Sequence, residues 1–175
     1  MQPAGYMNPA ASAEFTALLE DHRRLVFKVA NTYGRGRSDI EDLAQEIAAQ
    51  SWRAYPGYDS ARTFSTWLYR IALNVAISWL RAEVPRRRRS VPFNAELHDA
   101  TVNDTSDADD GDRILRGFIE SRGPLERALL LLYLEDRPNN EIAEILGITT
   151  TNVTTRISRL KERLRAYAEG KHGTR

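Results

Sequence analysis

The sequence predicts an all-α protein made of two small helical domains that a flexible linker joins. Apolar residues recur every three or four positions over residues 13–82 and again over residues 112–167, which is the spacing of one helix face. Residues 83–111 lose this periodicity and contain prolines, a basic run and several aspartates, as linkers do. No segment shows the alternation of a strand. We therefore expect an N-terminal helical bundle and a C-terminal helix-turn-helix.

Three helices are expected in the N-terminal domain. The first covers residues 13–33. The second begins with Ser38 as its N-cap and Glu41 three positions later, which is the spacing of a capping box. The third begins at Phe64 and is expected to end before Pro85, because a proline ring removes a helical hydrogen bond.

The C-terminal domain is expected to hold four helices, near residues 114–119, 124–133, 139–146 and 150–165. Pro124 is well placed as the first residue of a helix, where its missing N–H costs nothing. Gly147 suits the left-handed conformation that often ends a helix. Thr149 or Thr150 is expected to cap the last helix.

Composition excludes several classes of protein. The chain has 175 residues with 25 basic and 24 acidic side chains, so its net charge is only +1. It has no cysteine, which excludes disulfides and thiolate metal sites. No apolar run approaches the ~18 residues that span a bilayer, and no secretory signal is visible. We expect a cytoplasmic protein without membrane insertion.

No pattern of catalytic residues is present. The sequence has no nucleophile elbow, no glycine-rich phosphate loop and no zinc-ligand spacing. Its histidines, His22, His98 and His172, are scattered. We therefore expect no enzymatic activity, no catalytic residue, no metal site and no cofactor. His22 lies on an apolar helix face and is expected to be packed.

The helices 139–146 and 150–165 have the spacing of a helix-turn-helix. If the apolar residues of the second helix are buried, its other face carries a polar and basic set that suits a DNA major groove. A helix pair with a solvated basic face is the alternative, since cations also stabilise helix C-termini. The residues expected to contact DNA are Thr151, Asn152, Thr155, Arg156, Arg159 and Arg163.

An acidic stripe follows the start of the second N-terminal helix. Asp39, Asp42 and Glu46 share one face at helical spacing, with Gln45 beside them and Glu41 close by. Such a stripe suits a basic partner protein. Acids near a helix N-terminus also stabilise the helix without any partner, so the stripe alone does not decide.

Several segments resemble one known family. Leu125–Leu134, Asn140–Ile148 and residues 153–165 closely resemble the C-terminal domain of extracytoplasmic-function (ECF) sigma factors, and Asp39–Glu46 and Phe64–Asn74 resemble that family's N-terminal domain. The resemblance implies a transcription initiation factor that directs core RNA polymerase to promoters. It implies three partners: promoter DNA, core RNA polymerase through its largest-subunit clamp coiled coil and its flap region, and an anti-sigma factor.

The Phe64–Asn74 segment is the most specific match, and in the family it leads into the surface that melts the downstream promoter element. Asn74 matches a position at the pocket for a flipped base, whose edge an amide can bind as donor and acceptor. Tyr69 and Arg70 are expected to contact the DNA backbone or unstacked bases. Arg81, with the arginine run behind it, is expected to contact duplex phosphate, and a disordered basic run without such a contact is the alternative.

Two rival hypotheses are a stand-alone helix-turn-helix regulator and a helical adaptor that binds only proteins. The first leaves the acidic stripe and the Phe64–Asn74 match unexplained, and the second leaves the basic face around Arg156 unexplained. The linker, roughly 29 residues, reaches ~100 Å when extended. Promoter elements two helical turns apart are separated by about 70 Å. The sigma-factor hypothesis accounts for both domains and the linker in order.

Overall fold

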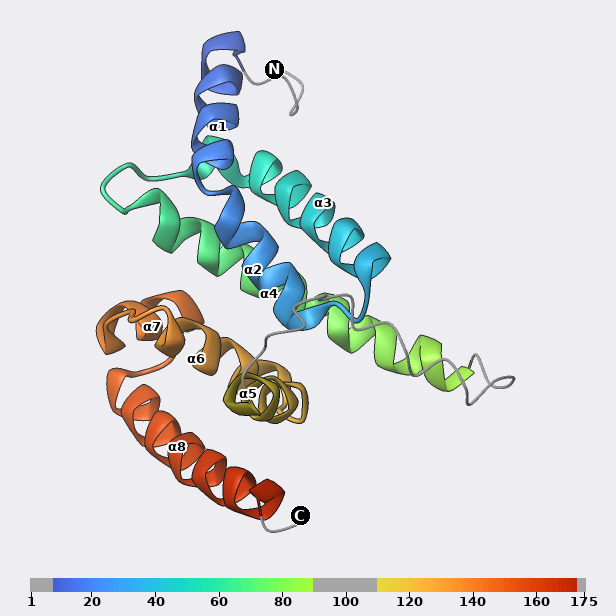
Figure 1. Cartoon of the computed structure of the whole chain (residues 1–175). Coiled ribbons are helices and arrows are strands. Elements are labelled where there is room, and N and C mark those ends of the chain that lie inside the picture. Colours follow the sequence, from blue (N-terminus) through green and yellow to red (C-terminus); the bar gives the residue numbers. More distant parts are fainter. Residues whose placement is uncertain (1–7, 90–109, 173–175) are drawn as a thin grey trace. The chain divides into compact units, whose positions relative to one another are not determined.

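The computed structural model describes residues 8–89 and 110–172, and their side chains up to residues 82 and 170. The chain divides into two compact units, Met1–Thr101 and Val102–Arg175, called here the N-terminal and the C-terminal unit. Every regular element within the described residues is a helix (Figure 1). The expected all-α architecture of two helical domains is confirmed.

The N-terminal unit packs three helices around one core. These are α2 (Arg23–Tyr33), α3 (Arg37–Ala54) and α4 (Phe64–Arg89), and each contacts the other two (Figure 1). The fully buried side chains come from all three, because each helix repeats apolar residues at helical spacing. The largest of them are Val29, Tyr33, Leu43, Ile47, Leu68, Tyr69 and Leu73.

The prediction of a single helix over residues 13–33 is wrong. The segment is divided at His22 into α1 (Pro9–Asp21) and α2, with His22 at φ −103° and ψ 14°. The ring Nδ1 of His22 lies 2.8 Å from the Leu18 carbonyl oxygen, and the ring packs edge-on against Phe64 with centroids 5.0 Å apart. The expected packing of His22 is therefore confirmed. A single-residue break hardly disturbs a 3.6-residue period, so the sequence pattern did not reveal it.

An aromatic cluster fixes the start of α4. Phe15 of α1 packs edge-on against Trp52, Tyr55 and Phe64, with centroids 5.0–6.4 Å apart. The half-buried Trp67 packs against Tyr55 and the neighbouring Tyr58. Edge-to-face pairs of this kind add stability beyond the area that they bury. The cluster joins α1, the end of α3 and the short 3₁₀ helix η1 (Tyr55–Gly57) to the first turn of α4.

The expected capping box at the start of α3 is wrong. The helix begins at Arg37 with Gly36 as its N-cap, and no side chain caps it. Glu41 pairs instead with Arg37 at 2.8 Å, and this hydrogen bond raises the pKa of the Arg37 guanidinium. Asp39 accepts a hydrogen bond from the Arg35 backbone N–H at 3.3 Å. The Asp39 carboxylate, one position after Ser38, thus reaches a backbone donor before the helix.

The expected end of α4 before Pro85 is also wrong, because the helix continues to Arg89. A proline removes one helical hydrogen bond but does not prevent helical backbone on either side, and the arginines that follow are good helix formers. Of the linker expected over residues 83–111, the part at 90–109 lies outside the described residues. The next helix begins at Asp110.

The C-terminal unit is built around α6 (Pro124–Leu134), whose residues 127–132 are all buried. Arg127 is only 6% exposed and donates from Nε to the Arg122 carbonyl at 3.0 Å and from Nη2 to the Glu120 carbonyl at 2.5 Å. It thus satisfies carbonyl groups at the end of α5 (Asp110–Glu120), which have no helical partner. A charged side chain is tolerated in this core because hydrogen bonds surround its head group.

The last helix is longer than expected. α8 runs from Thr150 to His172 rather than ending near residue 165. Its extension places Tyr167 against Phe118 of α5, with ring centroids 5.5 Å apart. A Cβ at Gly117 would lie 2.9 Å from the Tyr167 hydroxyl oxygen, so the absence of a side chain there makes room for the ring. The extra turns are stabilised by this packing on α5 rather than by a periodic pattern of their own.

The turn between α2 and α3 depends on Gly34. A Cβ at this position would lie 2.8 Å from Ile40 Cγ1, 3.0 Å from the Ala30 carbonyl oxygen and 3.1 Å from the Ile40 nitrogen. Two of these three atoms belong to the backbone, so they cannot move without displacing a helix end.

We expect Gly34→Ala to destabilise the N-terminal unit by about 1–3 kcal/mol, the usual cost of overpacking. All three tryptophans, Trp52, Trp67 and Trp79, belong to this unit, so urea unfolding followed by tryptophan fluorescence reports on it selectively. Gly57→Ala is the matched control, because a Cβ there meets no atom within 4 Å. Equal unfolding midpoints for the two variants would contradict the close approach at Gly34.

Candidate functional site

The acidic stripe of α3 separates into residues that have local partners and residues that do not. Asp39 and Glu46 are half-buried, and Glu46 accepts a hydrogen bond from Gln50 at 2.7 Å and lies 4.0 Å from Arg53. Glu41 is exposed but paired with Arg37. The remaining two, Asp42 and Gln45, are exposed and make no hydrogen bond or ion pair within the described residues. The centre of the stripe is therefore open to a partner.

The exposed strip of α4 consists of Arg70, Asn74 and Arg81. Successive members are four and seven residues apart, so all three lie on one side of the helix. The opposite side supplies the core residues Leu68, Ala72, Leu73 and Ala76. The α4 strip is thus held rigidly by the packing behind it.

Tyr69 does not belong to this strip, and the expected contact of its side chain with DNA is wrong for this conformation. Its side chain is only 1% exposed and lies in the core of the N-terminal unit. Tyr69 is one position before Arg70, so its side chain leaves the helix about 100° away from that of Arg70. The match to the family segment did not reveal the direction of this side chain.

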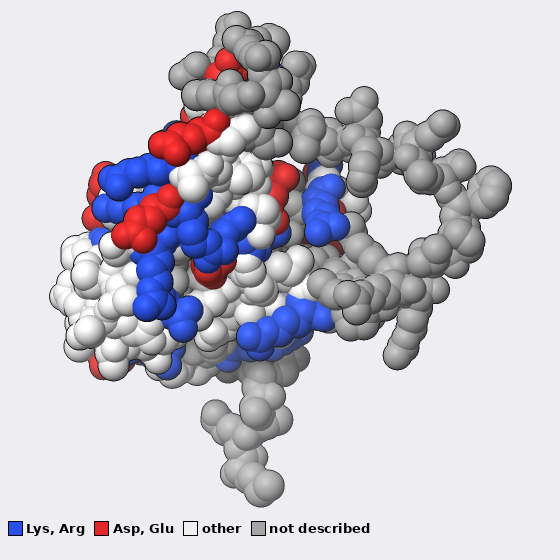
Figure 2. Space-filling model, turned by 90° about the horizontal axis from the view of Figure 1, so that it is seen from below, with Lys and Arg blue, Asp and Glu red and all other residues white. Residues whose placement is uncertain are grey.

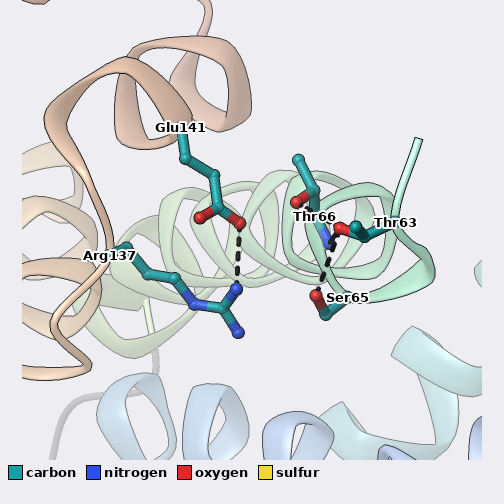
Figure 3. A network of polar contacts seen from close by, with 5 residues as sticks. All are labelled: Thr63, Ser65, Thr66, Arg137 and Glu141. Atoms are coloured by element: carbon teal, nitrogen blue, oxygen red, sulfur yellow. Dashed lines mark hydrogen bonds and ion pairs between the residues drawn. The ribbon is translucent and has the colours of Figure 1, made fainter.

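The first turn of α4 is fixed by Thr63. Its carbonyl accepts a hydrogen bond from the Trp67 backbone N–H at 3.2 Å, and its hydroxyl lies 2.8 Å from the Thr66 hydroxyl and 3.4 Å from that of Ser65 (Figure 3). The same Thr63 hydroxyl accepts a hydrogen bond from the Thr66 backbone N–H at 3.4 Å, a helix-start donor that has no helical partner. The start of the helix, and with it the register of the α4 strip, is thereby set.

The C-terminal unit contains the expected helix-turn-helix. Helix α7 (Asn139–Leu146) ends at Gly147, which has φ 66° and ψ 34°. This left-handed conformation is open to glycine at little cost. The Thr149 hydroxyl accepts a hydrogen bond from the Asn152 backbone N–H at 3.2 Å, so Thr149 caps α8. The first turn of α7 is braced by the ion pair of Arg137 and Glu141 at 2.9 Å (Figure 3).

One hydrogen bond ties α7 to the first turns of α8. Asn139 donates from Nδ2 to the Thr154 hydroxyl at 3.1 Å. Of the apolar residues expected on the inner side of α8, Val153, Ile157 and Leu160 are buried, whereas Leu164 is half-buried. The angle and register of the second helix of the motif therefore follow from contacts with the first.

The α8 face consists of the residues expected to contact DNA. Thr151, Thr155, Arg156, Arg159 and Arg163 are exposed, and Asn152 is half-buried. Arg156 donates from Nε to the Asn152 side-chain oxygen at 2.6 Å, which orients both groups. A groove of about 440 Å³ runs along this face, lined by Glu126, Asn152, Thr155, Arg156, Arg159, Leu160, Glu162 and Arg163.

Two acidic residues of the groove, Glu126 and Glu162, were not predicted from the sequence. Glu126 belongs to α6 and binds Arg163, which is 37 residues away. No local spacing links the two positions, so the sequence offered no signal for this contact. Figure 2 shows one face of the molecule, on which acidic side chains lie among basic ones.

Two family models match the chain, one on each unit. Residues 18–86 match Sigma-70 region 2, and residues 124–164 match Sigma-70, region 4. An ECF RNA polymerase sigma-E factor of Haemophilus influenzae is 31% identical over 148 residues, which cover 77% of this chain and 78% of that protein. The chain belongs to the ECF sigma factors of RNA polymerase. The family resemblance noted in the sequence is thereby confirmed.

Further comparisons agree with this assignment. The RNA polymerase sigma factor NccH of Alcaligenes xylosoxydans xylosoxydans is 26% identical over 166 residues, 89% of this chain and 87% of that protein. The sigma factor RpoE of Bartonella quintana, solved in complex with the anti-sigma factor NepR, has the same fold. That match has a TM-score of 0.68 and 19% identity, and it covers 89% of this chain and 97% of the solved one.

The matched regions coincide with the two units of this sigma factor. Region 2 includes α3 and the exposed strip of α4, and region 4 includes the helix-turn-helix. Among the described helices, none is both long and apolar enough to cross a membrane. In the same part of the chain, no three histidine or acidic side chains gather in a way that could hold a metal ion.

Proposed function

We propose that this sigma factor binds core RNA polymerase through α3, reads the upstream promoter element with α8, and recognises and helps to melt the downstream element with α4. The observation that supports this most strongly is the exposure of the α4 strip and the α8 face. Each is a polar surface on a helix whose opposite side builds the core of its own unit. One chain therefore carries two separately folded surfaces suited to nucleic acid.

The polymerase-binding surface of the proposal is centred on Asp42 and Gln45. Both are exposed and without a local partner within the described residues, so neither has to break an interaction to meet another protein. Asp39, Glu41 and Glu46 surround them with further negative charge. A basic partner suits this surface, and in the family that partner is the clamp coiled coil of the largest polymerase subunit. Complementary charge of this kind speeds association and fixes register.

The downstream element is recognised by the α4 strip in this proposal. The Asn74 amide has no partner within the described residues and can bind the edge of an extruded base as donor and acceptor. Arg70 and Arg81, on the same side of the helix, are placed for the DNA backbone. Capture of a single strand offsets the cost of unstacking, a few kcal/mol, so melting follows from binding and needs no catalysis by the sigma factor.

The upstream element is read by α8 docked in the major groove. Arg156 and Arg159 can bind guanine bidentately or contact phosphate, and Thr151, Asn152 and Thr155 lie at the N-terminal end that enters the groove in this motif. The polymerase flap region is the second contact of the C-terminal unit in the family resemblance. The linker that joins the two functions lies mainly at residues 90–109, outside the described residues.

An anti-sigma factor is a further partner that we propose. The Bartonella quintana RpoE, which has the same fold, was solved with the anti-sigma factor NepR bound. A protein that covers the α3 face or the α4 strip would compete directly with the proposed polymerase and promoter contacts.

Run-off transcription with core RNA polymerase on a library of genomic promoter fragments tests the whole proposal. Transcripts that depend on this chain and share two spaced upstream elements would support it. Duplex binding by the free chain with no effect on polymerase would favour a stand-alone helix-turn-helix regulator instead.

We expect Asp42→Lys to weaken binding of this sigma factor to core RNA polymerase by about tenfold or more, because it places like charges opposite each other. Fluorescence anisotropy of a labelled sigma factor titrated with core enzyme measures this. Asp21→Lys is the matched control, since Asp21 is also exposed and carries the same charge but lies on α1. An equal loss in both variants would show a general charge effect and contradict the proposed α3 interface.

We expect Asn74→Ala to reduce downstream-element recognition by about tenfold, the loss of one or two hydrogen bonds to a base edge. Polymerase binding should stay unchanged. Downstream-element recognition is measured as open-complex formation at a promoter found in the run-off experiment. Polymerase binding is measured by fluorescence anisotropy with core enzyme. Asn31→Ala, another exposed asparagine but on α2, is the control. A parallel loss of polymerase binding and open complex would contradict the assigned role of Asn74.

A further inference from the structure

A carboxylate from another helix reaches the end of the α8 face. Arg163 donates from Nη1 to Oε1 of Glu126 at 2.5 Å. The side chains are 49% and 27% exposed, so the pair lies at the protein surface. It joins α6 to α8, in contrast to the local pair of Arg137 and Glu141 four residues apart. Arg163 is one of the residues expected to contact DNA, and this bond gives it another partner.

Glu126 is held in place by the best-packed helix of the unit. It is the third residue of α6, directly before the buried run of residues 127–132. The first turn of a helix favours a negative charge, because the N-terminal end of the helix dipole is positive. The position of Glu126 in the first turn of α6 therefore suits its negative charge, and the buried residues that follow it fix the backbone from which its side chain reaches the groove.

The three arginines of the α8 face differ in their partners. Arg156 binds the neutral side chain of Asn152, which orients its charge without cancelling it. Arg159 is exposed and makes no hydrogen bond or ion pair within the described residues. Arg163 alone among the three binds a carboxylate in this part of the chain. Two of the three guanidinium groups are thus available to phosphate at their full charge.

A DNA phosphate and Glu126 compete for the same guanidinium group. Each arginine that neutralises a phosphate releases condensed counterions, so it adds to affinity for duplex of any sequence and makes binding more sensitive to salt. An arginine already paired with a carboxylate does not add this contribution unless the pair breaks. The unpaired carboxylate would then face the phosphates, which repel it.

We propose that Glu126 is a specificity-determining residue that restrains Arg163 and so lowers the affinity of the α8 face for duplex of arbitrary sequence. The inference rests on the proposed docking of α8 in the major groove. Weak non-specific binding is useful to a factor that must reach few promoters among a great excess of other sites. Glu126 acts through Arg163 and need not contact DNA itself.

Fluorescence anisotropy with a labelled duplex of random sequence, measured from 50 to 200 mM salt on the full chain, tests the proposal. We expect Glu126→Gln to add about one phosphate contact, which increases the loss of affinity over this salt range by about 3.5-fold. Arg163→Ala should leave the salt dependence close to that of the unaltered chain. Glu126→Gln combined with Arg163→Ala should do the same, because the gain requires the freed arginine.

Glu169→Gln is the matched control, since it removes one exposed carboxylate from α8 outside the groove. An unchanged salt dependence in Glu126→Gln, or one equal to that of Glu169→Gln, would overturn the proposal. So would a gain that persists in the double variant, because it would come from the lost charge alone. If the unaltered chain and all variants fail to bind duplex at 50 mM salt, the proposed docking of α8 is itself wrong, and the inference fails with it.

Discussion

Burial of one side of α4 is the interaction on which the N-terminal unit depends. This helix contributes Leu68, Tyr69 and Leu73 to the core between α2 and α3, and the aromatic cluster around Phe15 fixes its first turn. Because its inner side cannot rotate without exposing these residues, its outer side must present the strip of Arg70, Asn74 and Arg81 in one orientation. The orientation of this polar strip is thus fixed by the apolar packing behind it, and the strip itself need not contribute to stability.

In the C-terminal unit, a separate core helix fixes the orientation of the exposed polar face. α6 is buried along most of its length and places both the buried Arg127 and the groove residue Glu126. α8 packs on this core through Val153, Ile157 and Leu160, and the α8 face lies on its other side. The two units are small, so each buries a limited apolar area and their cores are marginal. Binding to a partner that recognises only the folded form stabilises each of them further.

The sequence predicted what depends on a regular period and missed what depends on a single residue or a distant contact. The apolar repeats identified α4, the helix-turn-helix and the all-α architecture, because a buried helix side requires that spacing. The break at His22 and the continuation of α4 past Pro85 leave that period almost unchanged. The burial of Tyr69 follows from the direction of one side chain, and the length of α8 follows from the packing of Tyr167 on Phe118. The local spacing of apolar residues predicts neither the burial of Tyr69 nor the length of α8.

The net charge of +1 says little about function, because most charged side chains of the candidate surfaces are engaged locally. On α3, Glu41 and Glu46 have partners on their own helix, whereas Asp42 has none within the described residues. On α8, Arg163 is paired with Glu126 and Arg159 has no such partner in the same part of the chain. A charge already paired must lose one interaction to gain another, so its net contribution to binding is small. The charges that the fold leaves without a local partner are the ones most available to a binding partner, and which charges these are depends on the three-dimensional contacts rather than on composition.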